Sequence, residues 1–311
     1  MSMRVAVVGV GHLGKHHARI FASMPGVELV AVVDTNQARA EEIAASNQTR
    51  ALLRTHSLLD SVDAVSIAVP TEQHLAVALP FLEAGVPVLV EKPMARSLEE
   101  ADQMIAAAAK SGVVLAVGQT ERFNPAVEVA RPMLTDPRFI EVHRLGTFPE
   151  RSLDIDVVFD LMIHDLDVVL SLVRSEVESI EAVGVPVLTG RVDIANARIR
   201  FANGCIANLT ASRISRDRVR KIRFFQPAAY VSIDYAAQKV EMYRLVKGEG
   251  PKPSIQGGDV PVVNEEPLKR ELSDFLDAIK SKRAPMVDGA QGRRALALAT
   301  EITKQMNELA K

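Results

Sequence analysis

A lysine stands where an apolar run ends in "VLVEKPMA", residues 88–95. An ammonium group beside a reacting hydroxyl stabilises the alkoxide that develops as the proton leaves. The simpler alternative is a surface charge pair of Lys92 with Glu91, but Pro93 restricts the residue before it, which is typical of a fixed turn. We therefore expect Lys92 to hold a substrate oxygen, with Glu91 in a supporting role.

The stretch "DLMIHDLD", residues 160–167, carries a second set of residues that could do acid–base chemistry. Asp160 and His164 are four residues apart and share one face of a predicted helix, and Asp167 lies near that face. A histidine beside carboxylates can be oriented and used as a general base. The alternative is a polar helix face in water, but several apolar neighbours favour a partly buried helix: Leu161, Ile163, Leu166 and Val168.

The N-terminal stretch "VAVVGVGHLGKHH" contains Gly9, Gly11 and Gly14 in G-x-G-x-x-G spacing. They follow a predicted strand and open a predicted helix, the context in which this motif binds a dinucleotide. Gly9 permits a tight turn, Gly11 lets a pyrophosphate approach the backbone, and Gly14 permits close helix–strand packing. The helix N-terminus offers N–H groups to the phosphates, and we expect His12 and Leu13 to contact the cofactor as well. The alternative is a glycine-rich turn without a ligand.

Asp34 ends the second predicted strand, 20 residues after Gly14. A carboxylate at this point can accept hydrogen bonds from the ribose hydroxyls of NAD and repels the 2′-phosphate of NADP. Thr35, beside it, offers that phosphate no cation, although Arg39 is near. A role of Asp34 as the N-cap of a helix over 36–45 is an alternative that can coexist with the first. The sequence favours NAD over NADP, with Thr35 next to the cofactor.

Polar residues also follow the strands that end at "AVPTEQH", residues 68–74, and at "VLVEKP". In an open α/β sheet, ligands bind outside the carboxyl ends of the strands. Pro70, Thr71, Glu91 and Lys92 are therefore expected near the nicotinamide. His74 is assigned to the same neighbourhood, and the start of a helix is its simplest role.

Three histidines, His12, His16 and His17, lie close together along the glycine-rich segment. No cysteine or acidic residue nearby completes a metal-ligand set. We interpret all three as solvated helix residues and expect no metal site.

The first 120 residues alternate between short β-branched runs and helical stretches. Predicted strands cover 4–8, 29–33, 64–69, 86–90 and 113–117, and the main helices between them cover 36–45, 73–84 and 97–110. The alternation predicts a doubly wound parallel sheet, and the nearly continuous apolar runs fit strands buried on both faces. Residues 1–121 are thus predicted to form an α/β Rossmann domain that binds the dinucleotide.

From residue 122 the pattern changes to longer, alternating strands around one long helix at 157–173. Asn203-Gly204 predicts one hairpin, and a second is predicted over 218–246 with its turn near "DYAAQK". The stretch "KGEGPKPSIQGGD", 247–259, is typical of a mobile loop, and helices are expected at 267–282 and 290–309. Residues 122–311 are predicted to be an α+β domain for substrate binding and oligomerisation, built on a mainly antiparallel sheet. Its final helix is able to pack back on the first domain.

The composition argues against several classes of partner. A net charge of −2 and an aromatic content of 4% do not suit nucleic-acid binding. No apolar run approaches the length of a membrane helix, and the single cysteine, Cys205, suits a reducing compartment. We expect no nucleic-acid partner, no membrane partner and a cytoplasmic location.

Together these motifs resemble the Gfo/Idh/MocA family of NAD(P)-dependent oxidoreductases, whose members act mainly on sugars and cyclitols. The resemblance covers nearly the whole chain and includes the glycine motif, "EKP", "RFNP" at 122–125, the D-x-x-x-H helix and "DGAQGRRAL". It implies that Lys92, Asp160 and His164 line one active site beside the nicotinamide. The implied reaction is reversible oxidation of a secondary alcohol, in which the proton role is shared between His164 and Lys92 in a way that the sequence does not divide.

The residues that would bind a substrate are less distinctive. Residues 191–223 hold nine Arg or Lys against two Asp. Arg216, Arg218 and Arg220 alternate, so on a strand they would face one way and suit a diphosphate, with Arg122 and Asp167 as further candidates. The alternative is a solvated or edge-guarding strand face.

The resemblance extends to the branch of the family that oxidises the 3-hydroxyl of UDP-N-acetylglucosamine. A dehydrogenase of a free sugar or of a cyclitol such as myo-inositol is the alternative. A non-catalytic nucleotide-sensing regulator is the alternative of another class, which the retention of Lys92, Asp160 and His164 disfavours. The sheet of the second domain, with one exposed face, predicts a homo-oligomer, a dimer or a tetramer.

Overall fold

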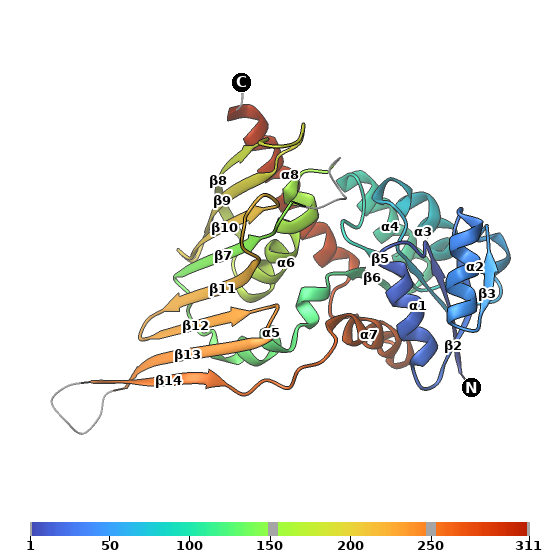
Figure 1. Cartoon of the computed structure of the whole chain (residues 1–311), viewed down its shortest axis with the longest axis horizontal. Helices are drawn as coiled ribbons and strands as arrows, with labels where there is room; N and C mark the ends of the chain where they lie inside the picture. The colour runs from blue at the N-terminus through green and yellow to red at the C-terminus, as the bar shows by residue number, and fades with distance from the viewer. Residues whose placement is uncertain (1, 149–154, 247–252, 310–311) are drawn as a thin grey trace. The chain divides into compact units, whose positions relative to one another are not determined.

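The computed structural model describes residues 2–148, 155–246 and 253–309 (Figure 1). The chain forms two compact units: Met1–Gln119 with Leu268–Leu296, and Thr120–Pro267 with Ala297–Lys311. The first division lies two residues before the predicted boundary at residue 121. The chain then returns to the first unit after residue 267, whereas the sequence predicted one continuous second domain.

The first unit is built on a six-stranded parallel sheet in the order β3-β2-β1-β4-β5-β6. This is the doubly wound Rossmann arrangement that the sequence predicts. The strands are β1 (Met3–Val8), β2 (Val27–Val33), β3 (Arg50–Leu52), β4 (Ala64–Ile67), β5 (Val88–Glu91) and β6 (Leu115–Gly118). The edge strand β3 was not predicted because it is only three residues long.

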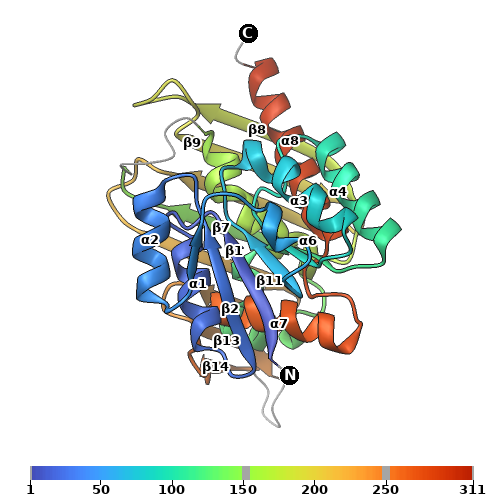
Figure 2. The same ribbon diagram turned by 90° about the vertical axis from the view of Figure 1, so that its right-hand side faces the viewer.

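Helices connect these strands and cover the sheet. Their bounds are α1 (Gly14–Ser23), α2 (Gln37–Ser46), α3 (His74–Glu83), α4 (Leu98–Ser111) and α7 (Pro267–Ser281), and α8 (Gly289–Leu309) begins in this unit. Helices α1 and α2 pack beside β1 and β2 (Figure 2). Because the strand order reverses direction at β1 and crossovers are right-handed, α3 and α4 cover the opposite face. They pack against each other there.

Helix α7 explains why the chain returns to the first unit. Its apolar side chains Leu272, Phe275 and Leu276 are buried in one core with Val5 and Phe21. An amphipathic helix must cover its apolar face, and here that face completes the covering of the sheet. The predicted packing of a late helix on the first domain therefore concerns α7 and the beginning of α8.

The second unit is built on an eight-stranded sheet in the order β14-β13-β12-β11-β7-β10-β9-β8 (Figure 1). Only β7 and β10 pair in parallel, so the sheet is mainly antiparallel, as predicted. The strands are β7 (Phe139–Leu145), β8 (Val177–Val185), β9 (Ile194–Phe201), β10 (Ile206–Ser212), β11 (Val219–Gln226), β12 (Ala229–Asp234), β13 (Lys239–Val246) and β14 (Ser254–Val260). The hairpin predicted at Asn203-Gly204 joins β9 and β10.

Two predictions for this sheet need correction. The hairpin predicted over 218–246 does turn at "DYAAQK", between β12 and β13, but the segment holds a third strand, β11, because an additional turn falls between Gln226 and Ala229. Ala228 adopts a positive φ of 59° in that turn, which its residue type does not suggest. The predicted loop over 247–259 is wrong in its second part, since Ser254–Val260 pair with β13. Its first part, 247–252, lies outside the described residues.

Helices α5 (Pro125–Ala130) and α6 (Ile163–Leu172) lie on the same face of this sheet (Figure 1). The inward residues of β7, such as Ile140 and Val142, are fully buried, whereas residues between them are partly exposed. Strands that are buried on one face alternate in this way. Within the described ranges, no helix is long and apolar enough to cross a membrane.

Candidate active site

The glycine-rich turn between β1 and α1 has the shape of a phosphate cradle. Gly9 has a φ of 82°, and a Cβ there would lie 2.8 Å from the backbone of Ala68. A Cβ on Gly14 would collide with the carbonyl oxygen of Gly9, so α1 can start this close to the strand only with glycine. Beside Gly11 there is open space within 4 Å. The turn therefore leaves room for a pyrophosphate against the backbone and the N-terminus of α1.

His12 and Leu13 lie within this turn and are exposed. Their positions agree with the predicted contact with a cofactor, which stays a prediction. His16 is partly exposed and its ring meets that of His12 edge-on at 6.2 Å. No group of three or more acidic, histidine or cysteine side chains that could hold a metal occurs among the described residues.

Asp34 follows β2 and is buried, with both carboxylate oxygens engaged. The backbone N–H groups of Val10 and Asn36 donate to it at 3.0 and 2.9 Å, and Arg39 donates from Nη2 at 2.7 Å. Burial by itself raises the pKa of Asp34, but the Arg39 guanidinium and the backbone donors hold that pKa below its ordinary value. The side chain that caps α2 is Asn36, which accepts from the N–H of Arg39, so the N-cap alternative for Asp34 is wrong.

The Asp34–Arg39 pair bears on the choice of cofactor. A carboxylate at this position can bind ribose hydroxyls, whereas an arginine nearby can accommodate a 2′-phosphate. Both groups are present and paired with each other. This geometry suits an adenine dinucleotide and does not by itself separate NAD from NADP. Thr35 is exposed beside the pair.

Glu91 and Lys92 end β5 at the carboxyl edge of the sheet, and their environments differ. Glu91 is 6% exposed, and its Oε1 lies 3.0 Å from Nε2 of His17. Lys92 is partly exposed, and its backbone N–H donates to Oε2 of Glu91 at 3.2 Å. The peptide bond between Lys92 and Pro93 is cis. The alternative of a charge pair at the surface is wrong for Glu91, because that carboxylate is buried.

His17 contradicts the sequence interpretation most clearly. We expected a solvated histidine, but His17 is 0% exposed and its Nδ1 lies 2.8 Å from Oγ of Ser66 on β4. Histidine is a polar residue type and suggests an exposed position, whereas the helical spacing that buries Ala18 and Phe21 also turns His17 towards the sheet. A G-x-G-x-x-G motif followed three residues later by histidine was the signal available.

His74 starts α3, as predicted, and joins two turns at the carboxyl edge of the sheet. Its Nε2 lies 2.9 Å from the carbonyl oxygen of Val69, and its Nδ1 lies 3.0 Å from that of Pro93. Burial lowers the pKa of His74 below its ordinary value, against these hydrogen bonds. Pro70 and Thr71 lie in the turn that His74 supports, where Pro70 is exposed and Thr71 is partly exposed. Contact of these three residues with a cofactor stays a prediction.

In the second unit, Asp160 and His164 lie where the predicted helix 157–173 changes its geometry. Val158–Met162 forms a π-helical turn, and α6 begins only at Ile163. Single π-helical turns occur frequently at functional sites. Asp160 and His164 are both partly exposed, while Ile163 and Leu166 between and beyond them are buried. The prediction that Asp160 and His164 share one face assumed a regular α-helix. The π-helical turn changes the spacing between side chains, so the shared face stays a prediction.

Buried charges that the sequence analysis did not assign anchor α6 to the sheet. Arg144 on β7 donates to Asp165 at 2.6 and 3.0 Å and to Glu121 at 3.1 Å. Although burial lowers it, the carboxylates of Asp165 and Glu121 raise the pKa of Arg144 above its ordinary value. The signal was present in "FIEVHRL", where Arg144 follows Ile140 and Val142 at the spacing that points inward.

Arg122 and Asp167, both predicted as substrate residues, are buried and paired with each other. The Nη1 atom of Arg122 donates to both carboxylate oxygens of Asp167, at 3.2 and 3.3 Å. This ion pair is a second anchor of α6 and gives both residues a structural role. Their contact with a substrate stays a prediction.

The predicted row of three arginines is wrong for two of its members. Strand β11 begins at Val219, so Arg216 and Arg218 precede it and do not alternate on a strand. Arg218 instead donates to the Thr147 hydroxyl at 3.3 Å. Arg220 does lie on β11, directly opposite Arg144 of β7, and it is exposed. Residues opposite each other on paired strands share a face, so Arg220 lies on the face of the sheet that carries α6.

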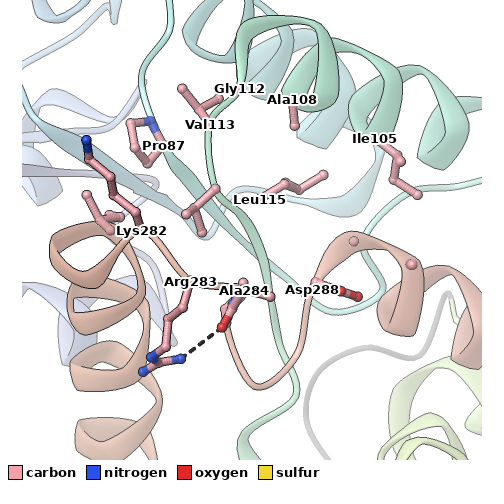
Figure 3. Close-up of a pocket in the computed structure, with 15 residues that line it drawn as sticks. Pro87, Ile105, Ala108, Gly112, Val113, Leu115, Lys282, Arg283, Ala284 and Asp288 are labelled. Carbon is pink, nitrogen blue, oxygen red and sulfur yellow. Dashed lines mark hydrogen bonds between the residues drawn. The ribbon is translucent and has the colours of Figure 1, made fainter.

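A hollow of about 670 Å³ in the first unit lies away from these groups (Figure 3). Pro87 and Leu115, which line it, stand at the amino ends of β5 and β6, opposite the edge with Lys92. Its Arg283 donates to the carbonyl oxygen of Ala284 at 2.9 Å, the dashed line in Figure 3. The hollow is therefore not the dinucleotide site.

Comparison with known proteins agrees with this arrangement. Residues 3–119 match the family described as oxidoreductase family, NAD-binding Rossmann fold, and residues 133–226 match the GFO/IDH/MocA C-terminal domain. UDP-N-acetylglucosamine 3-dehydrogenase of Acidithiobacillus ferrooxidans is 42% identical over 302 residues, which cover 96% of each chain. A solved structure of that enzyme superposes with a TM-score of 0.93 and covers 98% of this chain and 97% of its own.

More distant relatives extend the comparison. The scyllo-inositol 2-dehydrogenase (NAD(+)) of Bacillus subtilis is 30% identical over 68% of each chain. Levoglucosan dehydrogenase, solved with NADH and levoglucosan, is 20% identical with a TM-score of 0.89 over 99% of this chain and 98% of its own, which shows a shared fold. Since both units are matched and one relative is similar along the whole length, the chain is an enzyme of the Gfo/Idh/MocA family of NAD-binding oxidoreductases.

Proposed function

We propose that this oxidoreductase is an NAD-dependent dehydrogenase of the 3-hydroxyl of UDP-N-acetylglucosamine. The observation that carries this proposal is the 42% identity to a UDP-N-acetylglucosamine 3-dehydrogenase over 96% of both chains. Identity of that extent includes both units, so the resemblance is not confined to the cofactor domain. The proposed location is the cytoplasm, in keeping with the single cysteine, Cys205, which is a free, buried thiol.

The turn Gly9–Gly14 would hold the pyrophosphate of NAD, and Asp34 would hold its ribose. Bound NAD supplies the acceptor for the hydride of the alcohol carbon. Asp34 has to release or share Arg39 for this contact, since the guanidinium donates to both of its carboxylate oxygens. The carboxylate favours NAD over NADP because it repels a 2′-phosphate.

Three residues of the chain would act on the substrate hydroxyl. His164, oriented by Asp160, takes the hydroxyl proton as a general base. Lys92 donates a hydrogen bond to the oxygen and stabilises the negative charge that develops there. These roles follow from the family resemblance, and the partly exposed positions of all three side chains support them.

Arg220 is our candidate for the diphosphate of the nucleotide sugar. It is exposed on the face of the second sheet that carries α6, the helix with His164. A guanidinium binds phosphate in bidentate fashion. Arg198 provides a matched control because it lies on the other face of the sheet. Asn208 stands opposite Arg198 on one neighbouring strand and opposite Glu141 on the other, so the three side chains share that face.

The proposed enzyme is a homo-oligomer that associates through the open face of the second sheet. Four rings form a continuous cross-strand row there: Phe139, Phe225, Tyr230 and Tyr243. Successive ring centroids lie 5.6, 5.2 and 6.3 Å apart, and Phe225 and Tyr243 are exposed. Exposed apolar patches of this kind mark association surfaces. Mass photometry of the purified chain measures the oligomeric state directly.

The test of the substrate is the rate of NADH or NADPH formation over a panel of alcohols. The panel contains UDP-N-acetylglucosamine, UDP-glucose, free N-acetylglucosamine, myo-inositol and scyllo-inositol, each with NAD and with NADP. We expect the largest kcat/KM for UDP-N-acetylglucosamine with NAD. We expect Arg220→Gln to raise the KM for UDP-sugars about tenfold, as for loss of a charge-assisted contact, while Arg198→Gln leaves it unchanged.

Two outcomes would redirect the assignment. A preference for the cyclitols would instead support an inositol-type dehydrogenase, which the relative 30% identical over 68% of the chain favours. Tight NADH binding without turnover of any alcohol would point to a nucleotide-sensing regulator.

A further inference from the structure

A chain of buried polar contacts connects the cofactor helix α1 to the backbone of Lys92. His17 projects from α1 and is 0% exposed. Its two ring nitrogens lie within hydrogen-bond distance of Oγ of Ser66 on β4, at 2.8 Å, and of Oε1 of Glu91 on β5, at 3.0 Å. One imidazole thus joins a helix to two adjacent strands of the parallel sheet.

The hydrogen bonds of this cluster link all of its members. Because a carboxylate only accepts, Nε2–H of His17 donates to Glu91, while Nδ1 lies within hydrogen-bond distance of the Ser66 hydroxyl. The second carboxylate oxygen of Glu91 accepts the backbone N–H of Lys92 at 3.2 Å. Leaving a buried carboxylate oxygen without its donor is costly, so Glu91 would turn if its contact with His17 were lost.

A glycine also lies against the Glu91 carboxylate. Gly118 on β6 lies directly opposite Glu91, and a Cβ there would come within 3.1 Å of the carboxylate carbon and both oxygens. The carboxylate therefore fills the space that a side chain at position 118 would take. The imidazole of His17 on one side and the backbone of Gly118 on the other restrict the position of the Glu91 carboxylate. They thereby restrict the backbone of Lys92, which follows Glu91.

We propose that His17 is a positioning residue for Lys92, acting through Glu91. The inference rests on the proposed role of Lys92 at the substrate oxygen. His17 holds the Glu91 carboxylate, which holds the Lys92 backbone and so sets the point from which the ammonium reaches the substrate. The same imidazole ties this turn to α1, the helix that starts at the phosphate cradle.

Two substitutions at one position separate this role from packing. His17→Gln puts an amide N–H about where Nε2 stands and keeps the donor to Glu91. His17→Asn reaches only about as far as Nδ1 and loses it. We expect His17→Asn to slow single-turnover NADH formation at least tenfold, since displacements near 1 Å cost up to about 100-fold in rate. His17→Gln should stay within about threefold, and both variants should bind NADH within about twofold of wild type.

Hydrogen exchange of the Lys92 amide provides a readout that needs no substrate. Followed by mass spectrometry in the peptide that ends at Lys92, exchange should be faster in His17→Asn and unchanged in His17→Gln. Gly118→Ala approaches Glu91 from the other side and should also slow turnover and speed exchange. Gly190→Ala is its control, because a Cβ there meets nothing within 4 Å. Should His17→Asn fail to fold, Gly118→Ala carries the test.

If His17→Asn had the same turnover rate and the same Lys92 amide exchange rate as the wild type, the proposal would be overturned. It would also be overturned if His17→Asn weakened NADH binding as much as it slowed turnover, because His17 would then act on the cofactor. If the wild-type protein oxidised no alcohol, the proposed function would fail by itself, while amide exchange would still decide whether His17 holds the Lys92 turn.

Discussion

In the first unit His17, Ser66 and Glu91 form a buried cluster at the carboxyl edge of a parallel sheet. The cluster contains a single carboxylate, that of Glu91, which also accepts the backbone N–H of Lys92. In the second unit Arg144 on β7 is buried beneath α6 and forms ion pairs with two carboxylates, those of Asp165 and Glu121. The first cluster joins elements that already share one sheet. The second fixes a helix to a sheet that is covered by helices on only one face.

The difference concerns what each cluster is needed for. A sheet covered on both faces keeps its fold through apolar packing. A polar cluster at its edge is therefore not needed for stability and can position a neighbouring residue. A helix laid on one sheet face depends more on its anchors, and removal of one partner from a buried ion pair strands the other charge. We therefore expect substitutions in the first cluster to change rate and those in the second to change stability.

The largest expected effect is at the proposed catalytic residues, one in each unit. Lys92→Ala and His164→Ala should each lower kcat about 1,000-fold, the range for losing an oxyanion donor or a general base. NADH binding, measured by fluorescence titration, should stay near wild type. The controls are Lys110→Ala and His56→Ala, both at exposed positions. Near-normal kcat in both catalytic variants would remove Lys92 and His164 from the mechanism.

The comparison itself is tested by Arg144→Met. Loss of the guanidinium leaves the buried Asp165 without its ion pair and removes the partner of the partly exposed Glu121, which should lower the free energy of unfolding by about 3–5 kcal/mol. His17→Gln should cost about 1 kcal/mol or less, since it keeps the donor to Glu91 and gives up only the hydrogen bond with Ser66. Urea unfolding gives both values. The double variant Arg144→Met/Asp165→Leu should recover part of the loss. Equal costs at positions 17 and 144 would show that the two clusters serve the same purpose.

An effect smaller than that of Arg144→Met is expected at Asp193, which closes a loop beside the second sheet. Its Oδ2 accepts from the backbone N–H groups of Val187 and Leu188 at 2.8 and 2.6 Å, and Arg213 lies 3.2 Å from Oδ1. Burial alone would raise the pKa of Asp193, but the Thr189 hydroxyl and these backbone donors lower it from 3.8 to about 2.

Because the folded-state pKa is depressed, the stabilisation by Asp193 is present above its ordinary pKa of 3.8 and is lost as pH falls towards about 2. A shift of this size corresponds to about 2 kcal/mol at neutral pH. Asp193→Asn should lower the free energy of unfolding by about that amount at pH 7, with a smaller difference from wild type below pH about 4. A difference that is constant from pH 7 to pH 3.5 would contradict this assignment.

Several parts of the fold could be predicted because their signals are local. Glycine spacing after a β-branched run predicted the phosphate turn, and the cap residues of α4, Ser97 and Gly112, stand where helix signals place them. Two kinds of element were missed. Strand β14 contains Gly257 and Gly258, which suggest a loop and form a strand only because β13 pairs with them. The π-helical turn at Asp160 leaves no signature in an apolar helical pattern.

By itself, the sequence determined the Rossmann half, the mainly antiparallel second sheet and the residue types at the carboxyl edge, including Lys92 after β5. These features depend on the periodicity of apolar residues and on glycines in turns where other residue types do not fit. Only the tertiary structure decided that His17 is buried against Glu91, that Asp34 is paired with Arg39 and that Arg144 anchors α6. Each of these contacts joins a side chain to a partner on another element. Which polar groups meet is set by the packing of those elements, because buried polar groups must find partners wherever the fold brings them.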